Sequence, residues 1–389
     1  MKAAEIEVRN RPKVTDIRLN LIRQFGTSSM SYSALQEGMH AFTEGEAGFV
    51  PYFAVRGIKQ TPMVLGDPIC APEQRARLLD SFLQLYPEPI FLYLEEATAK
   101  LLNDRGFYAN EMGSETIIDL ESFDLRGSRK EFLRSQRNRA RKDGAKVFEL
   151  GISEVSTDAL KEISNRWMKK KSVNSRELKF LARPAVYDDE PDVRKFFATK
   201  NGEVIGFVFY DPIYSDGKVT GYMANILRSC AKVSYSITDY INLEAMEIFK
   251  KEGLKTLSLG FSPFHNVDDG GHFRYSKPLK LLFQNIFEHG NALYHFKELA
   301  FHKERYRPDI PGAHRIKIYG ATRSILPAAA LFQLFAKMGI INSPFRVQTP
   351  ELRDNSVFAR NVKNVAKSRD SSSKPDQPLT ELNPLPAKS

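Results

Sequence analysis

The chain has 389 residues, of which 42% are hydrophobic and 27% are charged. This composition indicates a globular chain long enough for two domains and excludes an intrinsically disordered chain. Only two cysteines occur, Cys70 and Cys230, which excludes a disulfide framework or a cysteine-based zinc site and favours a reducing compartment. The formal net charge of +10 favours polyanionic partners, either nucleic acid or an anionic membrane surface.

Both ends of the chain lack the hydrophobic periodicity of a folded segment. Residues 1–20 are polar, without the apolar run of a signal peptide, and residues 346–389 are rich in serine, proline and charge. We predict that both segments are disordered and that the protein is cytoplasmic.

The first half alternates strands and helices. Two β-rich runs at the start are followed by a helix, a strand, a second helix and a further strand. The predicted ranges are strands at 48–55 and 61–69, a helix at 71–86, a strand at 89–96, a helix at 97–106 and a strand at 115–122. Such alternation favours an α/β layer fold.

The second half repeats this order after a basic helix at 128–143. The predicted ranges are a helix at 155–171, strands at 193–202, 203–212 and 219–228, a helix at 236–253 and a strand at 254–261. The sequence Asn201–Gly202 predicts a hairpin turn between the first two of these strands. We therefore predict a duplicated α/β fold, with one domain over 21–125 and a second, catalytic domain over 126–323.

The most apolar stretch follows, at residues 324–341. Pro327, Gln333 and Lys337 interrupt it, and it is shorter than the roughly 20 residues that a bilayer-spanning helix needs. We predict a helix over 324–345 that packs on the core. The alternative is an interfacial helix, which would hold the protein on the inner face of the membrane.

The basic helix carries the strongest local pattern. Residues 126–146 contain nine lysines and arginines against two acids, and Arg134, Arg137 and Arg141 share one helical face. Forked guanidinium groups suit phosphate oxygens, so this face predicts binding of nucleic acid or anionic lipid. Further cations that we assign to the same surface are Lys142, Lys169 and Lys170, the last two close to Trp167. The alternative is a solvent-exposed helix with incidental charge.

A second pattern is the apolar strand that ends at Gly260 and breaks into a Ser-Pro turn. Ligands in α/β folds bind at strand ends. Gly260 would permit close approach of the backbone to a ligand, and Ser262 offers a hydroxyl group. An ordinary strand-to-loop turn is the alternative.

A third pattern, at residues 292–309, mixes aromatic side chains with Lys297, Lys303, Arg305 and Arg307. Such a mixture could orient an acyl or phosphate group through cation–π contacts and charged hydrogen bonds. Six of the seven histidines lie between His265 and His314, but without the spacing of metal ligands. We predict no metal site and expect these histidines to be surface or packing residues.

Six segments occur in the order of one family's landmarks between about residues 20 and 325. They are FGTSS at 25–29, GDP at 66–68, KEFLRSQRNRARKDG at 130–144, NILR at 225–228, LGFSPF at 259–264 and FKELAFHKERYRP at 296–308. Together they resemble the C-terminal catalytic domain of the lysyl- and alanyl-phosphatidylglycerol synthases, the multiple-peptide-resistance family.

This resemblance implies a tandem pair of acetyltransferase-like domains. It also implies that an aminoacyl-tRNA donor and a lipid acceptor approach a tunnel in the second domain from opposite sides. The sequence departs from the family pattern at Asn225, which replaces an acid, and at Phe261 and Ser262, which replace Met and Ala. These departures leave open which amino acid is transferred and whether the acceptor is phosphatidylglycerol, another lipid or a soluble molecule.

We predict an aminoacyltransferase that moves an amino acid from tRNA to a lipid acceptor such as phosphatidylglycerol, without cofactor or metal, because the ester is already activated. The oligomeric state stays open. The expected charged groups of the site are Arg228, Lys297, Lys303 and Arg305, with Tyr306 and Ser262 as proton-relay or oxyanion contacts. The expected substrate-lining residues are Asn225, Asp239, Gly260 and Phe261. The cations of the basic helix and Lys169 and Lys170 are assigned to tRNA.

Two other functions compete with this prediction. The first is a CoA-dependent acyltransferase of the same fold, but the loop at 229–236 has no glycine with which to cradle a pyrophosphate. The second is a non-catalytic module that binds RNA or an anionic membrane. The loss of the family's acid at Asn225 favours that module, and the retained segment 296–308 argues against it.

Overall fold

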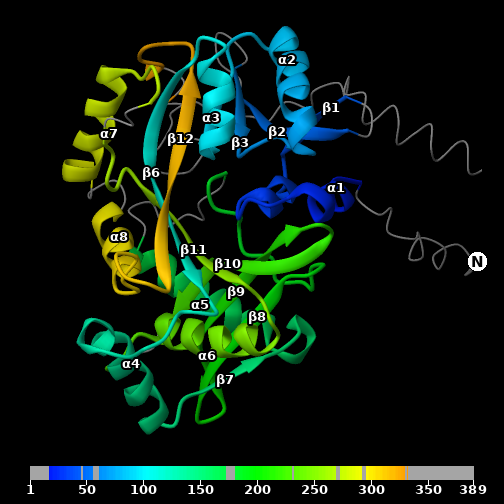
Figure 1. Ribbon diagram of the computed structural model, residues 1–389. Coiled ribbons are helices and arrows are strands. Elements are labelled where there is room, and N and C mark those ends of the chain that lie inside the picture. The colour runs from blue at the N-terminus through cyan, green and yellow to red at the C-terminus, as the bar shows by residue number, and fades with distance from the viewer. Residues whose placement is uncertain are drawn as a thin grey trace, which may run out of the picture.

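The structure is a computed structural model. It describes residues 17–44, 47–55, 61–171, 180–229, 232–268, 272–290, 295–328 and 331. The predicted disordered segment 346–389 and most of the predicted segments 1–20 and 324–345 lie outside these ranges. Where the predictions are covered they need correction, because residues 17–20 begin a helix and residues 324–327 are not helical. Figure 1 shows two α/β halves joined by long strands that run from one half into the other.

The first half contains nine of the elements labelled in sequence order. They are α1 (Ile17–Phe25), β1 (His40–Thr43), β2 (Gly48–Val55), β3 (Thr61–Leu65), β4 (Ile69–Cys70), α2 (Arg75–Leu85), β5 (Ile90–Leu94), α3 (Glu96–Asn103) and β6 (Tyr108–Asp119).

The second half begins with the basic helix. Its elements are α4 (Glu131–Lys142), β7 (Lys146–Glu149), α5 (Thr157–Lys171), β8 (Arg194–Lys200), β9 (Glu203–Ser215), β10 (Lys218–Ser229), α6 (Ile237–Lys251), β11 (Thr256–Pro263), α7 (Lys277–His289), α8 (Phe296–Glu304) and β12 (Ala313–Thr322). Short 3₁₀ turns lie at Ser31–Leu35, Pro72–Gln74, Ser128–Lys130 and Ile152–Glu154.

The described strands form one sheet that contains the same pattern twice. Its order is β1-β2-β3-β5-β12-β6-β11-β10-β9-β8-β7, and β4 pairs with β2. In the first copy β2 and β3 are antiparallel, and α2 leads to β5, which is parallel to β3. In the second copy β9 and β10 are antiparallel, and α6 leads to β11, which is parallel to β10. The predicted duplicated α/β fold is confirmed.

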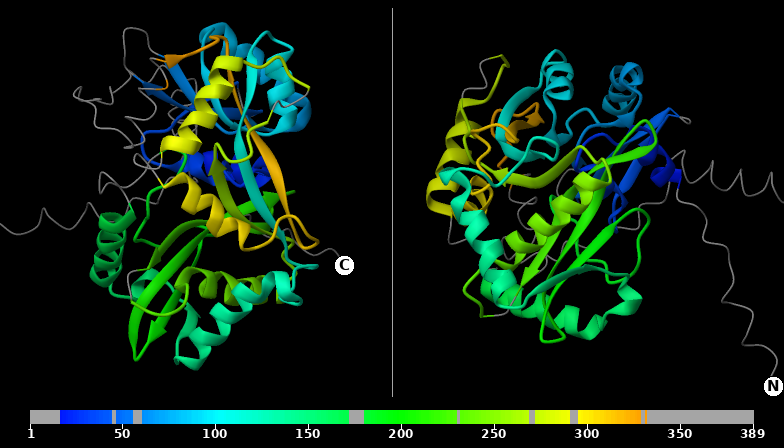
Figure 2. Two further views of the ribbon diagram at one scale, coloured as in Figure 1. Left: turned by 90° about the vertical axis from the view of Figure 1, so that its left-hand side faces the viewer. Right: turned by 60° about the horizontal axis from the view of Figure 1, so that its bottom comes forward.

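The two copies exchange strands. β6 belongs to the first copy in sequence but pairs with β11 of the second, and β12 from the end of the described chain pairs with β5 of the first. β6 and β12 also pair with each other along their length. The halves are therefore joined by backbone hydrogen bonds across the whole sheet, and Figure 2 shows the long strands crossing from one half to the other.

The strand predicted at 115–122 begins earlier, at Tyr108. Residues 108–114 are mixed in polarity and gave no alternation, yet they are largely buried because β12 covers one edge and α7 packs nearby. Asn110 shows how the polar side chains are satisfied. Its amide donates to the carbonyl oxygen of Ser276 (2.8 Å), and its side-chain oxygen accepts from the Ser276 N–H (3.0 Å).

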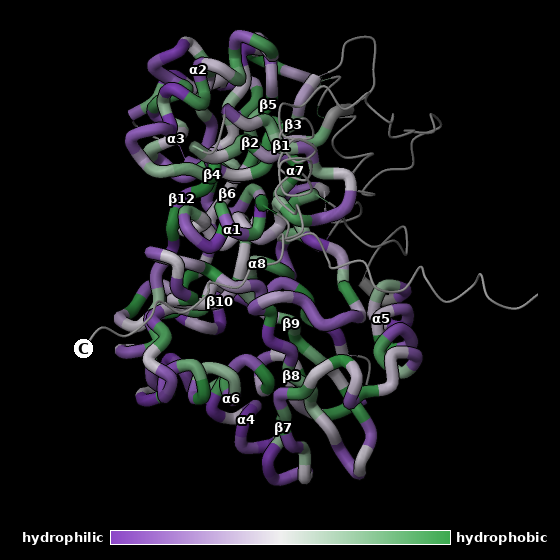
Figure 3. Tube along the Cα trace, turned by 90° about the vertical axis from the view of Figure 1, so that its right-hand side faces the viewer, coloured by the Kyte–Doolittle hydropathy of each residue, from purple (hydrophilic) through white to green (hydrophobic). Residues whose placement is uncertain are grey.

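Several elements were not predicted from the sequence, namely α1, β1, β7, α7, α8 and β12. The strand predicted at 61–69 is divided into β3 and β4. The start of α7 has an N-terminal cap, because the Ser276 hydroxyl accepts from the Leu279 N–H and a proline occupies the first turn. In Figure 3 hydrophilic and hydrophobic residues alternate along the tube of the helices that cover the sheet. None of the helices in the described ranges combines the length and hydrophobicity of a bilayer-spanning segment.

Candidate active site

Two irregularities in the sheet open a cavity between the halves. β10 and β11 pair only between Gly221–Met223 and Thr256–Ser258, and beyond this point they diverge. The pairing of β11 with β6 shifts register between Ser258 and Phe261, where Gly260 has a φ of +76°. A bulge at a glycine with positive φ bends a strand away from its neighbour. The predicted strand end at Gly260 is therefore the point where the sheet splits.

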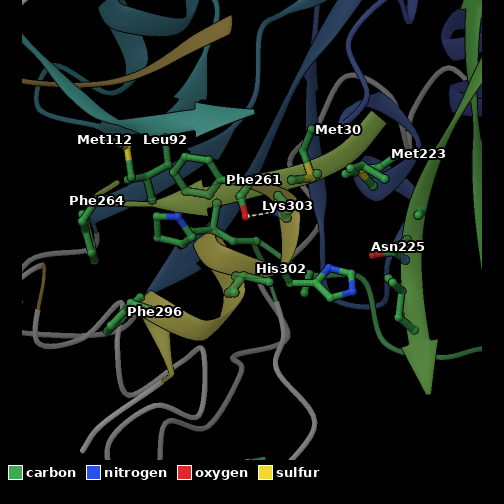
Figure 4. A pocket seen from close by; sticks show the side chains of 18 of the residues that line it. Met30, Leu92, Met112, Met223, Asn225, Phe261, Phe264, Phe296, His302 and Lys303 are labelled. Carbon is green, nitrogen blue, oxygen red and sulfur yellow. Dashed lines mark hydrogen bonds between the residues drawn. The ribbon is translucent and has the colours of Figure 1, made fainter. Parts of the chain in front are cut away.

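The cavity has a volume of about 190 Å³ and a mostly apolar lining. Figure 4 shows Phe264 and Phe296 at one end and Met223 and Asn225 at the other, with His302 and Lys303 between them. Among the described residues that line it, the polar side chains are those of Asn225, Asn242, His302 and Lys303. A cavity with few polar groups is the usual form of a site that binds an apolar or amphipathic molecule.

Lys303 of α8 is buried at this cavity. Its Nζ atom donates a hydrogen bond to the carbonyl oxygen of Phe261. Burial lowers the pKa of Lys303 to about 7, although the negative charge of Glu115 acts in the opposite direction. Gly260 leaves room beside the amine, because a Cβ at that position would lie 3.9 Å from Nζ. Lys303 can therefore exchange its proton near neutral pH.

Asp239 lies at the centre of a second polar group. It belongs to the first turn of α6, it is fully buried, and its Oδ1 lies 3.0 Å from Nε2 of His302. Its Oδ1 also accepts from the Tyr306 hydroxyl (2.9 Å), and its Oδ2 from Arg305 (3.3 Å). Burial alone would raise the pKa of Asp239, but the charge and hydrogen bond of His302, together with the hydrogen bonds of Ser236 and Tyr306, lower it to about 2.

The group continues inward through hydrogen bonds. The Asn242 amide donates to the Tyr306 hydroxyl (3.3 Å), and the Tyr210 hydroxyl donates to Oδ1 of Asn242 (2.7 Å). These three side chains are buried. Because each is held by a partner, the carboxylate of Asp239 and the ring of His302 are fixed in position.

Seven of the predicted site residues lie at the cavity or contact this polar group: Asn225, Asp239, Gly260, Phe261, Lys303, Arg305 and Tyr306. Asn225 lies at a bulge of β10, where the register with β9 shifts between Ala224 and Ile226, and its amide donates to the Arg183 carbonyl oxygen (3.3 Å). The departure from the family's acid thus lies on the wall of the cavity.

Three predicted residues belong neither to the cavity lining nor to the polar group around Asp239. Lys297 is exposed and pairs with Glu288 (2.7 Å). Ser262 is buried in β11 opposite Ser114 of β6. The Arg228 guanidinium lies over the Trp167 ring, 4.0 Å from its centre.

The three arginines assigned to one phosphate-binding face contact the protein itself. Arg134 donates to the carbonyl oxygens of Leu125 and Gly127, while Arg137 and Arg141 pair with Glu247 (3.4 Å) and Glu244 (2.7 Å) of α6. The expected cationic stripe is thus partly neutralised, because its arginines lie against acids on the neighbouring helix. Arg141 is still half-exposed in its ion pair, and the other exposed cations around α4 are Arg126, Arg129, Arg139, Lys142 and Lys146. Lys169 is exposed on α5, and the side chain of Lys170 lies outside the described residues.

Sequence alone predicted His302 to be a surface or packing residue, and its position corrects that prediction. It lines the cavity and pairs with a buried carboxylate. The only sequence signal for a functional role of His302 was its position next to Lys303, since its partner Asp239 is distant in the sequence. Within the described ranges, no group of three or more His, Cys, Asp or Glu side chains is arranged to hold a metal ion.

Comparison with known proteins places these features in context. Residues 19–314 match the family described as phosphatidylglycerol lysyltransferase, C-terminal. The phosphatidylglycerol lysyltransferase of Bacillus subtilis (strain 168) is 25% identical over 258 residues, which cover 65% of this chain and 29% of that protein. The corresponding protein of Staphylococcus epidermidis (RP62A) is 24% identical over 301 residues, covering 74% and 34%.

The fold is also found in a solved structure. L-PGS from Bacillus licheniformis superimposes with a TM-score of 0.66 at 19% identity, covering 83% of this chain and 96% of that one. The chain spans about a third of the length of the curated relatives it matches.

Proposed function

This chain belongs to the family of phosphatidylglycerol lysyltransferase C-terminal domains, and from that premise we propose that it transfers an aminoacyl group from aminoacyl-tRNA to a lipid acceptor such as phosphatidylglycerol. The names of the relatives support the lipid acceptor and lysine as the first amino acid to test. The net charge of +10 supports a polyanionic donor.

One observation carries the proposal: a mostly apolar cavity contains a buried amine, Lys303, beside an imidazole, His302, that is paired with a buried carboxylate. An amphipathic acceptor suits the apolar walls. The amine and imidazole supply the proton transfers and the charge stabilisation that acyl transfer from an ester requires.

In the proposed reaction the acceptor hydroxyl attacks the carbonyl carbon of the aminoacyl ester. His302, held by Asp239, accepts the hydroxyl proton as the new C–O bond forms. Protonated Lys303 stabilises the negative charge on the carbonyl oxygen of the tetrahedral intermediate. The bond to the ribose oxygen of the tRNA then breaks, and that oxygen receives the proton from His302.

The position of Asp239 argues against CoA as the donor. A CoA pyrophosphate binds at a helix N-terminus, where backbone N–H groups and the helix dipole attract negative charge. In this chain the first turn of α6 already holds the Asp239 carboxylate, and the hydroxyl of Ser236 caps the N–H of Asp239 (3.4 Å). The N–H of Asp239, one of the donors that a pyrophosphate would need at that helix end, is therefore already occupied.

The proposal is tested with tRNA charged with radiolabelled lysine and with vesicles that contain phosphatidylglycerol. We expect label in the extracted lipid, loss of that label when ribonuclease is added before the reaction, and no effect of removing acetyl-CoA. A parallel reaction with labelled alanyl-tRNA tests the amino acid. Transfer that survives ribonuclease but requires CoA would contradict the donor assignment.

A further inference from the structure

Two exposed aromatic rings contact an arginine beside the cavity. The Arg305 guanidinium carbon lies 4.6 Å from the ring centre of Phe132, at the start of α4, and 5.2 Å from that of Phe301 in α8. Figures 1 and 2 both show α4 next to α8. Phe132 is 44% exposed and Phe301 is 63% exposed. We call these three side chains the aromatic stack.

The aromatic stack is not explained by the packing of the fold. Neither ring belongs to a hydrophobic cluster of the described residues. Arg305 is nevertheless fixed, because it donates to the buried carboxylate of Asp239 (3.3 Å). Two large apolar rings thus stay open to solvent in contact with a guanidinium that is held in place, an arrangement with no benefit to the core.

The aromatic stack lies at the edge of the proposed active site. Phe301 directly precedes His302 and Lys303, which line the cavity, and Arg305 shares Asp239 with His302. On the other side Phe132 adjoins the exposed basic residues around α4, among them Arg129. A long ligand that entered the cavity across this edge would contact both the aromatic rings and the positively charged side chains.

We propose that the aromatic stack binds the unpaired bases at the 3′ end of the RNA donor, with bases stacked on the open faces of Phe132 and Phe301. This inference rests on the proposed function, because it assumes that the aminoacyl ester enters the cavity on RNA. Single-stranded RNA is recognised by stacking of bases on aromatic rings and guanidinium planes, while nearby cations contact the phosphates.

A membrane surface fits the same rings less well. If Phe132 and Phe301 entered the hydrocarbon region, the Arg305 guanidinium that contacts both rings would lose water at a high free-energy cost. Stacked bases cover the ring faces and leave the edge of the guanidinium accessible to water and phosphate.

The inference is tested by RNA binding alone, without amino acid or lipid. The probes are two fluorescent RNA hairpins with the same stem, one with a single-stranded 3′ overhang and one blunt. We expect the Phe132→Ala/Phe301→Ala variant to bind the overhang hairpin at least about fivefold more weakly than the unsubstituted protein and the blunt hairpin equally well. Phe148→Ala, which removes a ring that is also 44% exposed but lies on β7, should change neither affinity. Phe301→Trp should retain the preference for the overhang.

The inference would be overturned if the double variant bound each hairpin with the same affinity as the unsubstituted protein. It would also be overturned if the double variant kept its RNA binding but lost association with anionic vesicles, because the rings would then contact membrane. Since the hairpins carry no amino acid, a failure of this binding and a failure of aminoacyl transfer are separate results.

Discussion

The Nζ atom of Lys303 donates a hydrogen bond to the main-chain carbonyl oxygen of Phe261. That carbonyl follows Gly260, the residue at which β11 changes register against β6 and has already separated from β10. The splitting of the sheet thus provides the cavity. It also provides the carbonyl oxygen that holds the buried Lys303 amine of α8 against β11.

Replacing Gly260 with alanine should lower both the stability and the activity, whereas the control variant described below should lose stability alone. Its φ of +76° disfavours a side chain, while the space around the position would admit a methyl group. We expect about 1 kcal/mol lower stability in denaturant unfolding and a reduced kcat, because Phe261 and Lys303 shift. Gly253→Ala is the control, because Gly253 has a similar φ of +79° with nothing nearby. It should lose similar stability and keep its activity; equal kcat for both variants would contradict the role of Gly260.

Replacing Lys303 with methionine should stabilise the protein in a pH-dependent way. The folded pKa of Lys303, about 7, lies below its ordinary value of 10.5, so the unfolded chain binds the extra proton between these values. The free-energy cost of burying the Lys303 amine therefore lowers the stability fully below pH 7. This cost decreases as the pH rises toward 10.5. We expect Lys303→Met to unfold with a free energy on the order of 5 kcal/mol higher below pH 7. Denaturant unfolding across this range checks it; a difference that does not change with pH contradicts it.

Replacing Asp239 with asparagine should have the opposite pH dependence. The folded pKa of Asp239, about 2, lies below the ordinary 3.8, so its carboxylate stabilises the fold above pH 3.8, and this contribution is lost as the pH falls through 2. We expect Asp239→Asn to be about 3 kcal/mol less stable at neutral pH, because His302, Arg305 and Tyr306 lose their shared acceptor. The deficit should shrink in acid unfolding. Asp309→Asn, at an exposed aspartate paired with Arg307 (2.6 Å), is the control and should change little.

Replacing His302 with glutamine should reduce catalysis more than binding. Glutamine can still donate to Asp239 but cannot accept the acceptor's proton, so we expect kcat to fall about 100-fold with little change in the KM for charged tRNA. His314→Gln changes an exposed histidine of β12 and should leave both constants unchanged. Steady-state transfer assays make the comparison. A His302→Gln enzyme with nearly full kcat would exclude His302 as the proton acceptor.

Removing two carboxylates should strengthen RNA binding. Glu244 and Glu247 hold Arg141 and Arg137 of α4, so Glu244→Gln/Glu247→Gln should release both guanidinium groups toward phosphate. We expect tighter RNA binding and a salt dependence steeper by up to about two phosphate contacts in a titration of affinity against salt. Glu203→Gln, an exposed position on β9, is the control. If the dependence of RNA affinity on salt concentration did not change, the RNA would bind at a surface other than α4.

Apart from β7, the order of elements from 48 to 261 could be predicted because it depends on local periodicity. Each of these strands and helices buries one face or a short apolar run, and the turn at Asn201–Gly202 has its own sequence preference. The strand end at Gly260 and the basic and aromatic segment around Lys303 could be identified in the same way, since glycine, charge and aromatic content are properties of a short stretch.

The tertiary structure alone decided which residues meet. The exchange of β6 and β12 between the halves, the pairing of Asp239 with His302 and the capture of Arg137 and Arg141 by α6 all join segments that are distant in the chain. Periodicity in the sequence indicates that one face of an element is buried, but it does not identify the element that packs against that face. The composition of the whole chain and the spacing within α4 indicate a cationic stripe, and only the packing of α6 against that face shows that two of its arginines already have carboxylate partners.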